Sequence, residues 1–197
     1  MTRRSLTYAG LTFSLVAGLL LLAVGLPRWL ASSSPGETGT SSETAGTASR
    51  RIRARLFFVA QDGMHLMSVE REVLFGEGTV EQAKRILEAQ LGPAPAPLAT
   101  AIPAGTKLRA IYLTERGEAY VDLSVEAGSA HSGGTMNEIL TVYTIVNALT
   151  VNLPAISGVQ LLIDGKEVDT LAGHVDLRRP LQQNLGWVAE SQPLNDR

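Results

Sequence analysis

Cysteine is absent from this chain of 197 residues. Its absence excludes disulfide bonds, lipid attachment at a cysteine, thiol nucleophiles and metal sites built from thiolates. If the folded part is exported, it must therefore be stabilised by its own hydrophobic core, with no covalent cross-link to help.

Long basic runs are absent and aromatic side chains are few. No run of Lys or Arg exceeds two residues, and the globular part carries more acidic than basic residues. Because phosphate binding needs a basic footprint, we expect neither a nucleic-acid partner nor tight docking onto anionic lipid. Aromatic residues make up 5% of the chain, which is few for the stacking platforms of a sugar-binding cleft.

The chain does contain a long and strongly apolar run without charge, from Tyr8 to Leu26. An α-helix of this length can cross the hydrocarbon core of a bilayer. Arg3 and Arg4 precede the run and no acidic residue does, so we expect a single transmembrane anchor in the cytoplasmic membrane with its N-terminus inside. The alternative is a signal peptide cleaved near Ala31-Ser32-Ser33. Both readings place the domain outside the cytoplasm.

The composition divides the chain into five segments. Residues 31–49 have alanine as their only apolar type, so they bury too little surface to offset the entropy of ordering them. We expect a cytoplasmic N-terminus, a transmembrane helix, a disordered Ser/Thr/Gly linker, one globular domain and a flexible tail, at residues 1–7, 8–26, 27–50, 51–188 and 189–197.

Strands in the globular part are indicated by β-branched and aromatic residues and by turn signals. Asp62-Gly63 and Asp164-Gly165 mark hairpin turns, because glycine accepts the positive φ that tight turns require. The strands expected on this basis are residues 52–60, 64–73, 107–114, 118–123, 158–163 and 167–171.

Two helices are predicted among these strands. The first opens at a capping box of Thr79 and Gln82, and the second at one of Thr135 and Glu138, where each pair of side chains would satisfy free backbone N–H groups. The resulting order is β-β-α-β-β-α-β-β. It predicts an α+β domain with two helices packed on one face of a mostly antiparallel sheet.

Several short motifs follow one another through the domain. They are Leu56 to Val59 before Asp62-Gly63, a helix ending in Leu91-Gly92-Pro93, the run Ile102 to Thr106, the run Ala119 to Ser124, and Tyr143-Thr144-Ile145. In this order and spacing the chain resembles the GerMN domain of sporulation and germination proteins. The motif positions carried over are Gly92, Pro93, Pro103, Gly105, Asp122, Ser124, Tyr143, Thr144, Asp164, Gly165 and Pro180.

The resemblance implies an exported accessory protein, held at a membrane by a helix or a lipid. It also implies a fold similar to the ring-building modules of secretion machines, so that self-association or binding of envelope proteins is expected. Members of that family have no assigned active site. This chain departs from the family in lacking the lipid-anchor cysteine and in holding one such domain where two can occur in tandem.

The motif residues can also be explained by structural roles alone. Gly92-Pro93 is typical of a helix stop, and Pro103 and Gly105 are typical turn formers. Asp122 lies at the end of a strand, where its carboxylate is expected to cap the turn at Ser124 or the loop that follows.

The candidate catalytic and ligand-binding residues of this sequence are its histidines and glycine-rich loops. His65 is expected on a half-exposed strand, and His131 in a Gly/Ser loop without the third group that a nucleophile and its base require. His174 and Asp176 have strand spacing, but two ligands are too few for a metal site. Residues 76–78 lack the pattern of a phosphate-binding loop. We therefore expect no catalytic residue, metal, cofactor or small-molecule substrate.

Three functions are compatible with this sequence. The first is a non-enzymatic interaction module tethered outside the cytoplasmic membrane, acting as an assembly factor of an envelope or sporulation-type complex. The second is a domain that binds an envelope polymer such as peptidoglycan. The third is a hydrolase that uses a carboxylate pair or the loop of His131.

Overall fold

The computed structural model describes residues 50–189 and shows a mixed α+β fold, as predicted. Its elements are β1 (Arg51–Val59), β2 (Leu66–Leu74), α2 (Gly78–Gln90), β3 (Leu108–Leu113), β4 (Glu118–Leu123), α3 (Glu126–Ser129), α4 (Thr135–Asn152), β5 (Gly158–Ile163), β6 (Lys166–Glu167) and the 3-10 helix η1 (Leu185–Trp187). The predicted span Tyr8–Leu26, the segment 1–7, nearly all of the linker and the tail after Ala189 lie outside these residues. Within the described part, no helix has the length and apolar character to cross a bilayer.

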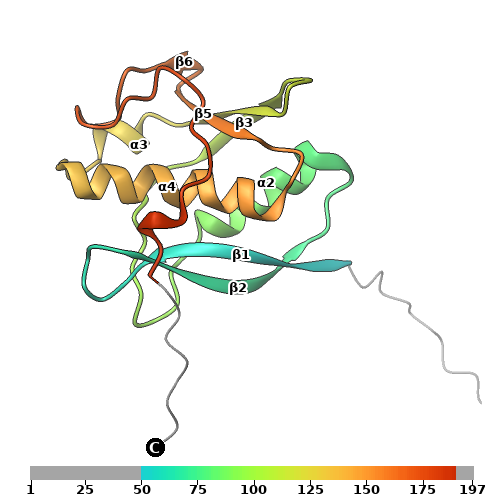
Figure 1. The fold of residues 1–197 in the computed structure, drawn as a ribbon, viewed down its shortest axis with the longest axis horizontal. Helices are drawn as coiled ribbons and strands as arrows, with labels where there is room; N and C mark the ends of the chain where they lie inside the picture. Colours follow the sequence, from blue (N-terminus) through green and yellow to red (C-terminus); the bar gives the residue numbers. More distant parts are fainter. Residues whose placement is uncertain (1–49, 190–197) are drawn as a thin grey trace, which may run out of the picture. The chain divides into compact units, whose positions relative to one another are not determined.

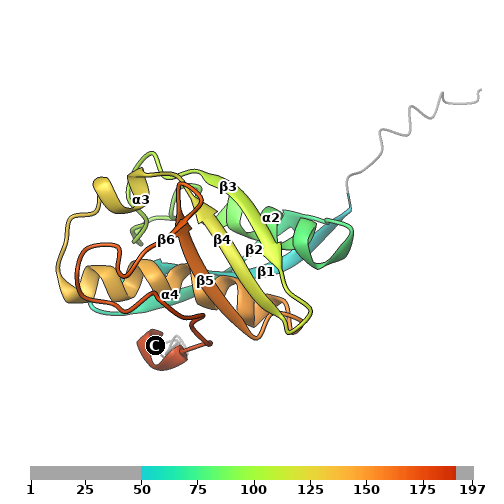
Figure 2. The ribbon, with the colours of Figure 1, turned by 90° about the horizontal axis from the view of Figure 1, so that it is seen from above.

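The strands form two sheets, which corrects the prediction of a single one. β1 and β2 make a two-stranded antiparallel hairpin, and the other strands make a four-stranded sheet in the order β3-β4-β5-β6. Figures 1 and 2 show α2 and α4 as a layer between the hairpin and the larger sheet. The helices are therefore covered on two sides, and the expectation that they occupy one face of one sheet is wrong.

The larger sheet contains one parallel pair. β4 and β5 run in the same direction, with Val121 opposite Leu161, and the chain crosses between them through α3 and α4. Parallel neighbours need such a long crossover, whereas antiparallel neighbours can be joined by a short turn. The sequence pattern of six short strands gave no signal for this pair, because alternation does not report strand direction.

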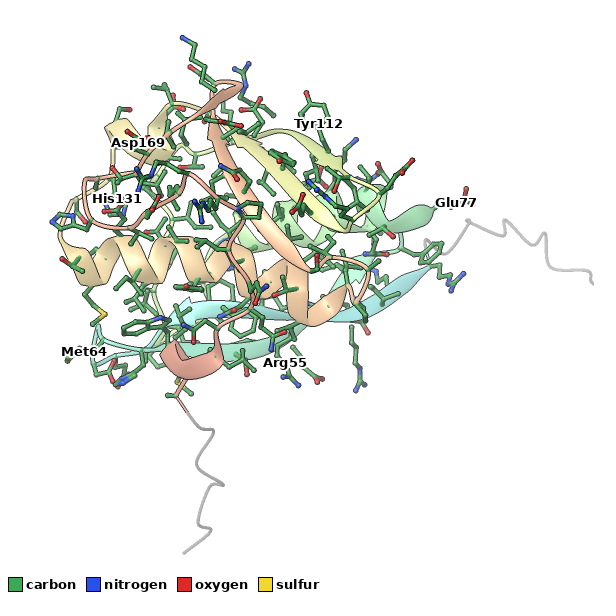
Figure 3. All side chains as sticks on the ribbon, turned by 45° about the horizontal axis from the view of Figure 1, so that its top comes forward. Arg55, Met64, Glu77, Tyr112, His131 and Asp169 are labelled. Carbon is green, nitrogen blue, oxygen red and sulfur yellow. The ribbon has the colours of Figure 1, made fainter. Side chains whose placement is uncertain are left out.

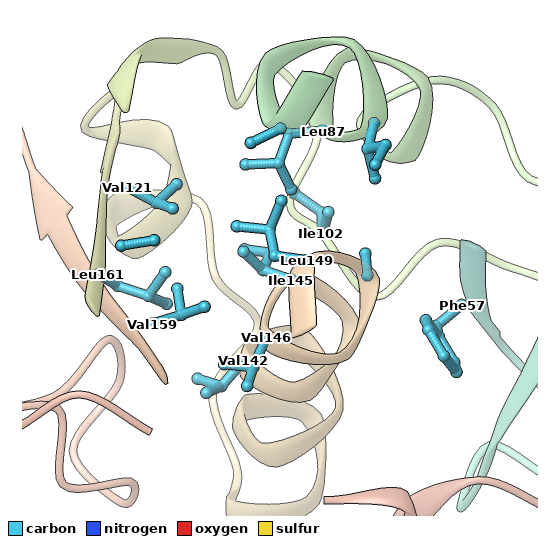
Figure 4. Packing of buried hydrophobic residues seen from close by; sticks show 14 of the residues in the cluster. Phe57, Leu87, Ile102, Val121, Val142, Ile145, Val146, Leu149, Val159 and Leu161 are labelled. Atoms are coloured by element: carbon cyan, nitrogen blue, oxygen red, sulfur yellow. The ribbon is translucent and has the colours of Figure 1, made fainter. Parts of the chain in front are cut away.

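Helix α4 lies at the centre of the hydrophobic core. Figure 4 shows its side chains beside those of α2, of the larger sheet and of the hairpin. The labelled core residues are Phe57, Leu87, Ile102, Val121, Val142, Ile145, Val146, Leu149, Val159 and Leu161. Each such side chain contributes about 1.5–3 kcal/mol when it is fully buried. A helix enclosed in this way needs apolar residues around much of its circumference, which explains why residues 136–149 are so apolar.

The outer edge of β1 is closed by side-chain amides. The N–H of Arg55 donates to Asn152 Oδ1 at 2.8 Å, and Asn152 Nδ2 donates to the carbonyl of Arg55 at 2.7 Å. Two residues further on, the N–H of Phe57 donates to Gln90 Oε1 at 2.8 Å, and Gln90 Nε2 donates to the carbonyl of Phe57 at 2.7 Å. Each amide thus takes the place of a residue in a neighbouring strand.

The same edge continues with a backbone pair. Val59 and Ala99 exchange both N–H···O=C bonds, at 2.8 and 3.0 Å. Arg55, Phe57 and Val59 therefore have their outward-pointing backbone groups satisfied, although β1 is an edge strand. Asn152 and Gln90 stand at the ends of α4 and α2, so the helices align β1 by hydrogen bonds as well as by apolar contact.

Both predicted capping boxes are wrong. Neither α2 nor α4 has a side-chain bond at its N-cap, and these N-caps are Glu77 and Gly134. Gln82 instead reaches back to accept the N–H of Gly76 at 2.9 Å. The carboxylate of Glu138 instead accepts N–H groups of the loop that follows β6. A Thr followed by Gln or Glu three residues later therefore located both helix starts to within two residues without forming the predicted bonds.

Gln90→Leu tests the closure of the β1 edge. The change preserves most of the side-chain volume but leaves the buried N–H and carbonyl of Phe57 without partners. We expect a loss of about 3 kcal/mol in the free energy of unfolding, because each orphaned buried polar group costs about 1–3 kcal/mol. Urea unfolding of the segment 50–197, followed by Trp187 fluorescence, measures it. Gln183→Leu, at an exposed position, is the control, and equal stability of the two variants would contradict the expectation.

Candidate functional site

Charged residues gather at the carboxyl ends of the parallel strands β4 and β5. Asp122 lies near the end of β4, and Asp164 directly follows β5. Arg109 of β3 donates from Nε to Asp122 Oδ2 at 3.1 Å and from Nη1 to Asp164 Oδ1 at 2.9 Å. We call these three residues the Arg109 cluster. It lies where parallel sheets commonly bind ligands, outside the carboxyl ends of strands.

Within the cluster, Asp122 also caps the turn between β5 and β6. Its side chain is 7% exposed, and Oδ1 accepts the N–H of Gly165 at 2.7 Å. Asp164 and Gly165 have φ of 50° and 75°, the left-handed pair required by a tight hairpin turn. The expectation that Asp122 caps the turn at Ser124 or the loop that follows it is therefore wrong, because the parallel pairing of β4 with β5 brings the Asp164-Gly165 turn to its carboxylate.

The cluster pairs one guanidinium with two carboxylates, so it keeps a net negative charge. The hydrogen bond and the negative charge of Asp122 raise the pKa of Arg109 above its ordinary value. Arg109 thus stays protonated and holds both carboxylates as acceptors. Asp122 is engaged twice, by this guanidinium and by the N–H of Gly165. The geometry favours a role in fixing the loops after β4 and β5.

The motif residues Pro103, Gly105 and Ser124 lie at the start of β3 and the end of β4. The N–H and hydroxyl of Thr106 both donate to the carbonyl of Pro103, and Gly105 has φ of 84°. The hydroxyl of Ser124 accepts the N–H of Lys107 at 2.9 Å. These bonds form the turn before β3 and join it to the end of β4.

A second polar centre surrounds Glu138 in the first turn of α4. Its side chain is fully buried. One oxygen accepts the N–H groups of Leu171 and Ala172 at 2.8 and 3.0 Å, and the other accepts the N–H and the ring Nδ1 of His174 at 2.8 and 3.2 Å. We call this arrangement the Glu138 clamp. It holds the loop that follows β6 against the helix.

Two opposing effects set the ionisation of Glu138. Burial raises the pKa of the carboxyl, but the backbone N–H groups of Ala172, His174 and their neighbours together lower it, and the net shift is downward. Glu138 is therefore an anion at neutral pH although it is buried. Its four acceptor contacts satisfy the charge that burial would otherwise make costly.

The other motif positions are dispersed. Pro93 accepts a bond at its carbonyl from Arg71 Nη2 at 3.0 Å, directly after α2. Tyr143 and Thr144 lie within α4, where Thr144 is fully buried. Pro180 packs against Gly158, since a Cβ added there would lie 3.3 Å from the Cβ of Pro180. The fold thus brings Asp122, Asp164 and Gly165 together, but not these residues or Gly92.

None of the three histidines lies in a catalytic arrangement. His65 binds Asp62 at 2.7 Å in the β1–β2 loop. His131 Nδ1 accepts the N–H of Gly133, and its Nε2 lies 3.0 Å from the hydroxyl of Thr141. These contacts assign the neutral tautomer with the proton on Nε2. Both ring nitrogens are therefore occupied by structural contacts.

His174 and Asp176 are not brought together as a ligand pair. His174 turns to Glu138, while Asp176 binds the guanidinium of Arg178 at 2.7 and 2.9 Å. Over residues 50–189, no group of three or more His, Cys, Asp or Glu side chains is placed to hold a metal ion.

Sequence reasoning missed Arg109 and misread Glu138. Arg109 is a single exposed arginine in a strand, so nothing nearby in the sequence pointed to it. Glu138 was assigned to a capping box, although the N–H groups that its carboxylate accepts come from residues 33 to 36 positions away. The one usable signal was its position: an acid in the first turn of an otherwise very apolar helix.

Comparison with known proteins agrees with the resemblance found in the sequence. A family model described as Germane, for sporulation and spore germination, matches residues 55–169. The first GerMN domain of the sporulation protein GerM from Bacillus subtilis has a TM-score of 0.52 and 22% identity, over 66% of this chain and 97% of that one. No curated protein matches the chain.

Two further solved structures are similar. The tandem GerMN domains of Bacillus subtilis GerM have a TM-score of 0.50 and 17% identity, over 69% of this chain and 46% of that one. This chain therefore spans about half of the tandem pair. A candidate lipoprotein from Clostridium perfringens has a TM-score of 0.49 and 24% identity, over 73% of this chain and 93% of that one. At these identities the likeness to the GerM domains is one of fold.

Glu138→Gln tests the clamp and its dependence on pH. The amide nitrogen cannot accept the N–H of His174, so we expect a loss of about 3 kcal/mol in the free energy of unfolding at neutral pH. Because the pKa of Glu138 is lowered in the folded protein from its ordinary 4.5, the stabilisation is present above that pH and is lost as the pH falls below it.

The measurement is urea unfolding of both proteins between neutral pH and about pH 3. The difference between wild type and Glu138→Gln should shrink as the pH falls. A difference that stays constant across this range would show that the charge of Glu138 does not stabilise the fold.

Asp122→Ala tests the Arg109 cluster. It removes the acceptor of the Gly165 N–H and one partner of Arg109, and we expect a loss of about 2 kcal/mol. Asp122→Asn retains an oxygen for Gly165 and should lose about half as much. Urea unfolding measures both variants. Asp169→Ala, at an exposed position, is the control, and an equal loss there would argue against a specific role for Asp122.

Proposed function

Because the chain belongs to the Germane family of sporulation and spore germination, we propose that it is a non-enzymatic accessory protein that binds other envelope proteins outside the cytoplasm. The family match carries this proposal. It runs from within β1 to just beyond β6, and so includes the helix layer and strands of both sheets.

The geometry of the polar residues supports binding over catalysis. Asp122, Asp164 and Glu138 have guanidinium or backbone N–H partners, and His131 has both ring nitrogens engaged. A nucleophile or general base must instead face a space that a substrate can enter. The third function suggested by the sequence, hydrolysis by a carboxylate pair or by the loop of His131, is therefore the least supported.

Attachment to the membrane is part of the proposal. The charge-free run Tyr8–Leu26 has the length of a transmembrane helix, and the linker after it resembles a flexible coil. The domain would then work close to the outer surface of the membrane, where envelope partners are within reach. Flotation of the full chain with vesicles tests this attachment directly.

The outer face of β3 is the surface that we assign to protein contact. β3 is an end strand of its sheet, and Tyr112 on it is 59% exposed. Figure 3 shows Tyr112 directed away from the helices. Tyrosine is enriched among the residues that dominate binding energy, since it offers a large contact area and a hydroxyl. Arg109 lies on the same strand with 49% of its side chain exposed.

The same face favours a second candidate function, binding of an envelope polymer. Tyr112 lies directly opposite Tyr120 across β3 and β4, so two aromatic rings share one surface despite the low aromatic content of the chain. Sugar rings stack on such surfaces. Co-sedimentation of the protein with purified peptidoglycan sacculi distinguishes this function from protein binding.

Tyr112→Ala in the full-length protein tests the contact surface. After cross-linking in cells and solubilisation of the membrane, we expect capture of envelope proteins to fall at least about five-fold, the effect of losing one dominant contact residue. Mass spectrometry quantifies the captured proteins. Met64→Ala, 55% exposed near the tip of the β1–β2 hairpin, is the control. Unchanged capture in the Tyr112 variant, or none by an abundant wild type, would contradict the proposal.

A further inference from the structure

Four arginines lie together at the beginning of the folded domain. Arg50, Arg51, Arg53 and Arg55 are all exposed, and we call them the arginine strip. Arg51, Arg53 and Arg55 occupy alternate positions of β1, and alternate residues of a strand share one face of its sheet. A search for consecutive basic residues does not detect this strip, because other residues separate the arginines in the sequence although the strand places them on one face.

The strip faces away from the core. Ala54, Leu56 and Phe58 on the opposite face of β1 are buried, whereas the side chain of Arg53 is 81% exposed. In Figure 3 the side chain of Arg55 points outward from the hairpin, on the side away from the helices. The guanidinium groups are thus presented to whatever lies outside the hairpin.

The strip is only partly neutralised. Glu70 and Glu72 lie opposite Arg55 and Arg53 on β2, and the one ion pair formed across the described hairpin, Arg53 with Glu70, measures 4.0 Å between exposed groups. Arg50 stacks on the ring of Phe75 at 3.8 Å. Four positive charges against two negative ones leave an excess on this face, while residues 50–189 as a whole hold thirteen basic and fifteen acidic residues.

Two features near the strip suit an interface with headgroups. A depression of about 280 Å³ lies beside it, lined by Arg53, Ala54, Arg55, Glu70, Val151 and Asn152. Phe75 and Leu74, at the end of β2, are 36% and 39% exposed. Basic side chains with neighbouring exposed apolar ones are the composition of surfaces that rest on anionic bilayers.

We propose that the arginine strip docks on the anionic phospholipids of the membrane that anchors the chain, and so orients the domain with its hairpin toward the bilayer. This inference rests on the proposed membrane attachment. The strip is the first part of the domain after the linker, and a flexible coil of about 20 residues spans roughly 25 Å. At the high effective concentration set by such a tether, a weak attraction is enough to choose one orientation.

Docking in this manner leaves the opposite side of the domain accessible. The remaining residues of the described domain carry nine basic and thirteen acidic side chains once the strip, Glu70 and Glu72 are set aside. That surface is repelled by anionic lipid, which reinforces the orientation. Tyr112 would then face away from the membrane, toward partners.

The experiment uses the full chain in vesicles and exploits its lack of cysteine. One cysteine introduced at Ser68, an exposed residue of β2, or at Glu115, in the turn between β3 and β4, carries a donor dye. The acceptor is a labelled lipid in phosphatidylcholine vesicles with or without phosphatidylglycerol. Phosphatidylglycerol should raise the transfer from the dye at Ser68 above that from Glu115 by about two-fold or more, and high salt should abolish the difference.

Charge variants assign the effect to the strip. Arg51→Glu, Arg53→Glu and Arg55→Glu combined should remove the response to phosphatidylglycerol, and the corresponding three Lys substitutions should retain it. The matched control reverses three exposed charges elsewhere: Arg116→Glu, Lys166→Glu and Arg179→Glu. Equal transfer from both dye positions, or equal loss in the control, would overturn the proposal, as would preferential binding of the strip to duplex DNA.

Flotation separates this proposal from the membrane attachment. A wild-type chain that fails to float with pure phosphatidylcholine vesicles lacks an inserted anchor, and the proposed attachment is then wrong. In that case docking is judged by flotation with vesicles that contain phosphatidylglycerol: binding of the wild type and not of the Glu variant supports the strip, and binding of neither overturns it.

Discussion

The pairing of β1 with two side-chain amides is the interaction on which the rest of the domain depends. A two-stranded sheet alone is marginally stable in water, and apolar packing alone does not fix where such a sheet sits. Asn152 and Gln90 attach β1 to the ends of α4 and α2 through four hydrogen bonds. They also fill the positions at which another strand could add to that edge. The hairpin is thereby made part of one core.

The Arg109 cluster and the Glu138 clamp fix the positions of loops by hydrogen bonds, as the two amides fix the position of β1. Both use carboxylates, which accept several N–H groups at once, and both are anchored on rigid elements, a strand and a helix. The carboxylates of Asp122 and Glu138 are thus occupied by donors within the domain. The contact surfaces that we propose are the outer faces of the domain, with Tyr112 and Arg55 on opposite sides of the helix layer (Figure 3), so that one side would meet the membrane while the other meets a partner.

Local features of this fold could be predicted, and long-range ones could not. Asp164-Gly165 specified its turn because the positive φ is a property of those two residues. The apolar sequence of α4 predicted a buried helix. The parallel pairing of β4 with β5, by contrast, depends on the path of the crossover, and it decided which turn Asp122 caps. Glu138 was located correctly at a helix start, but its partners lie more than thirty residues away, beyond what a local motif can encode.

The bond between Arg55 and Asn152 joins residues 97 positions apart. During synthesis, β1 therefore exists as an unfinished edge until almost all of α4 has followed it from the ribosome. An edge of this kind is a template for pairing with other chains. Between the synthesis of β1 and that of the end of α4, the nascent protein is open to aggregation or to capture by a chaperone. This interval grows when translation of α2 or α4 is slowed.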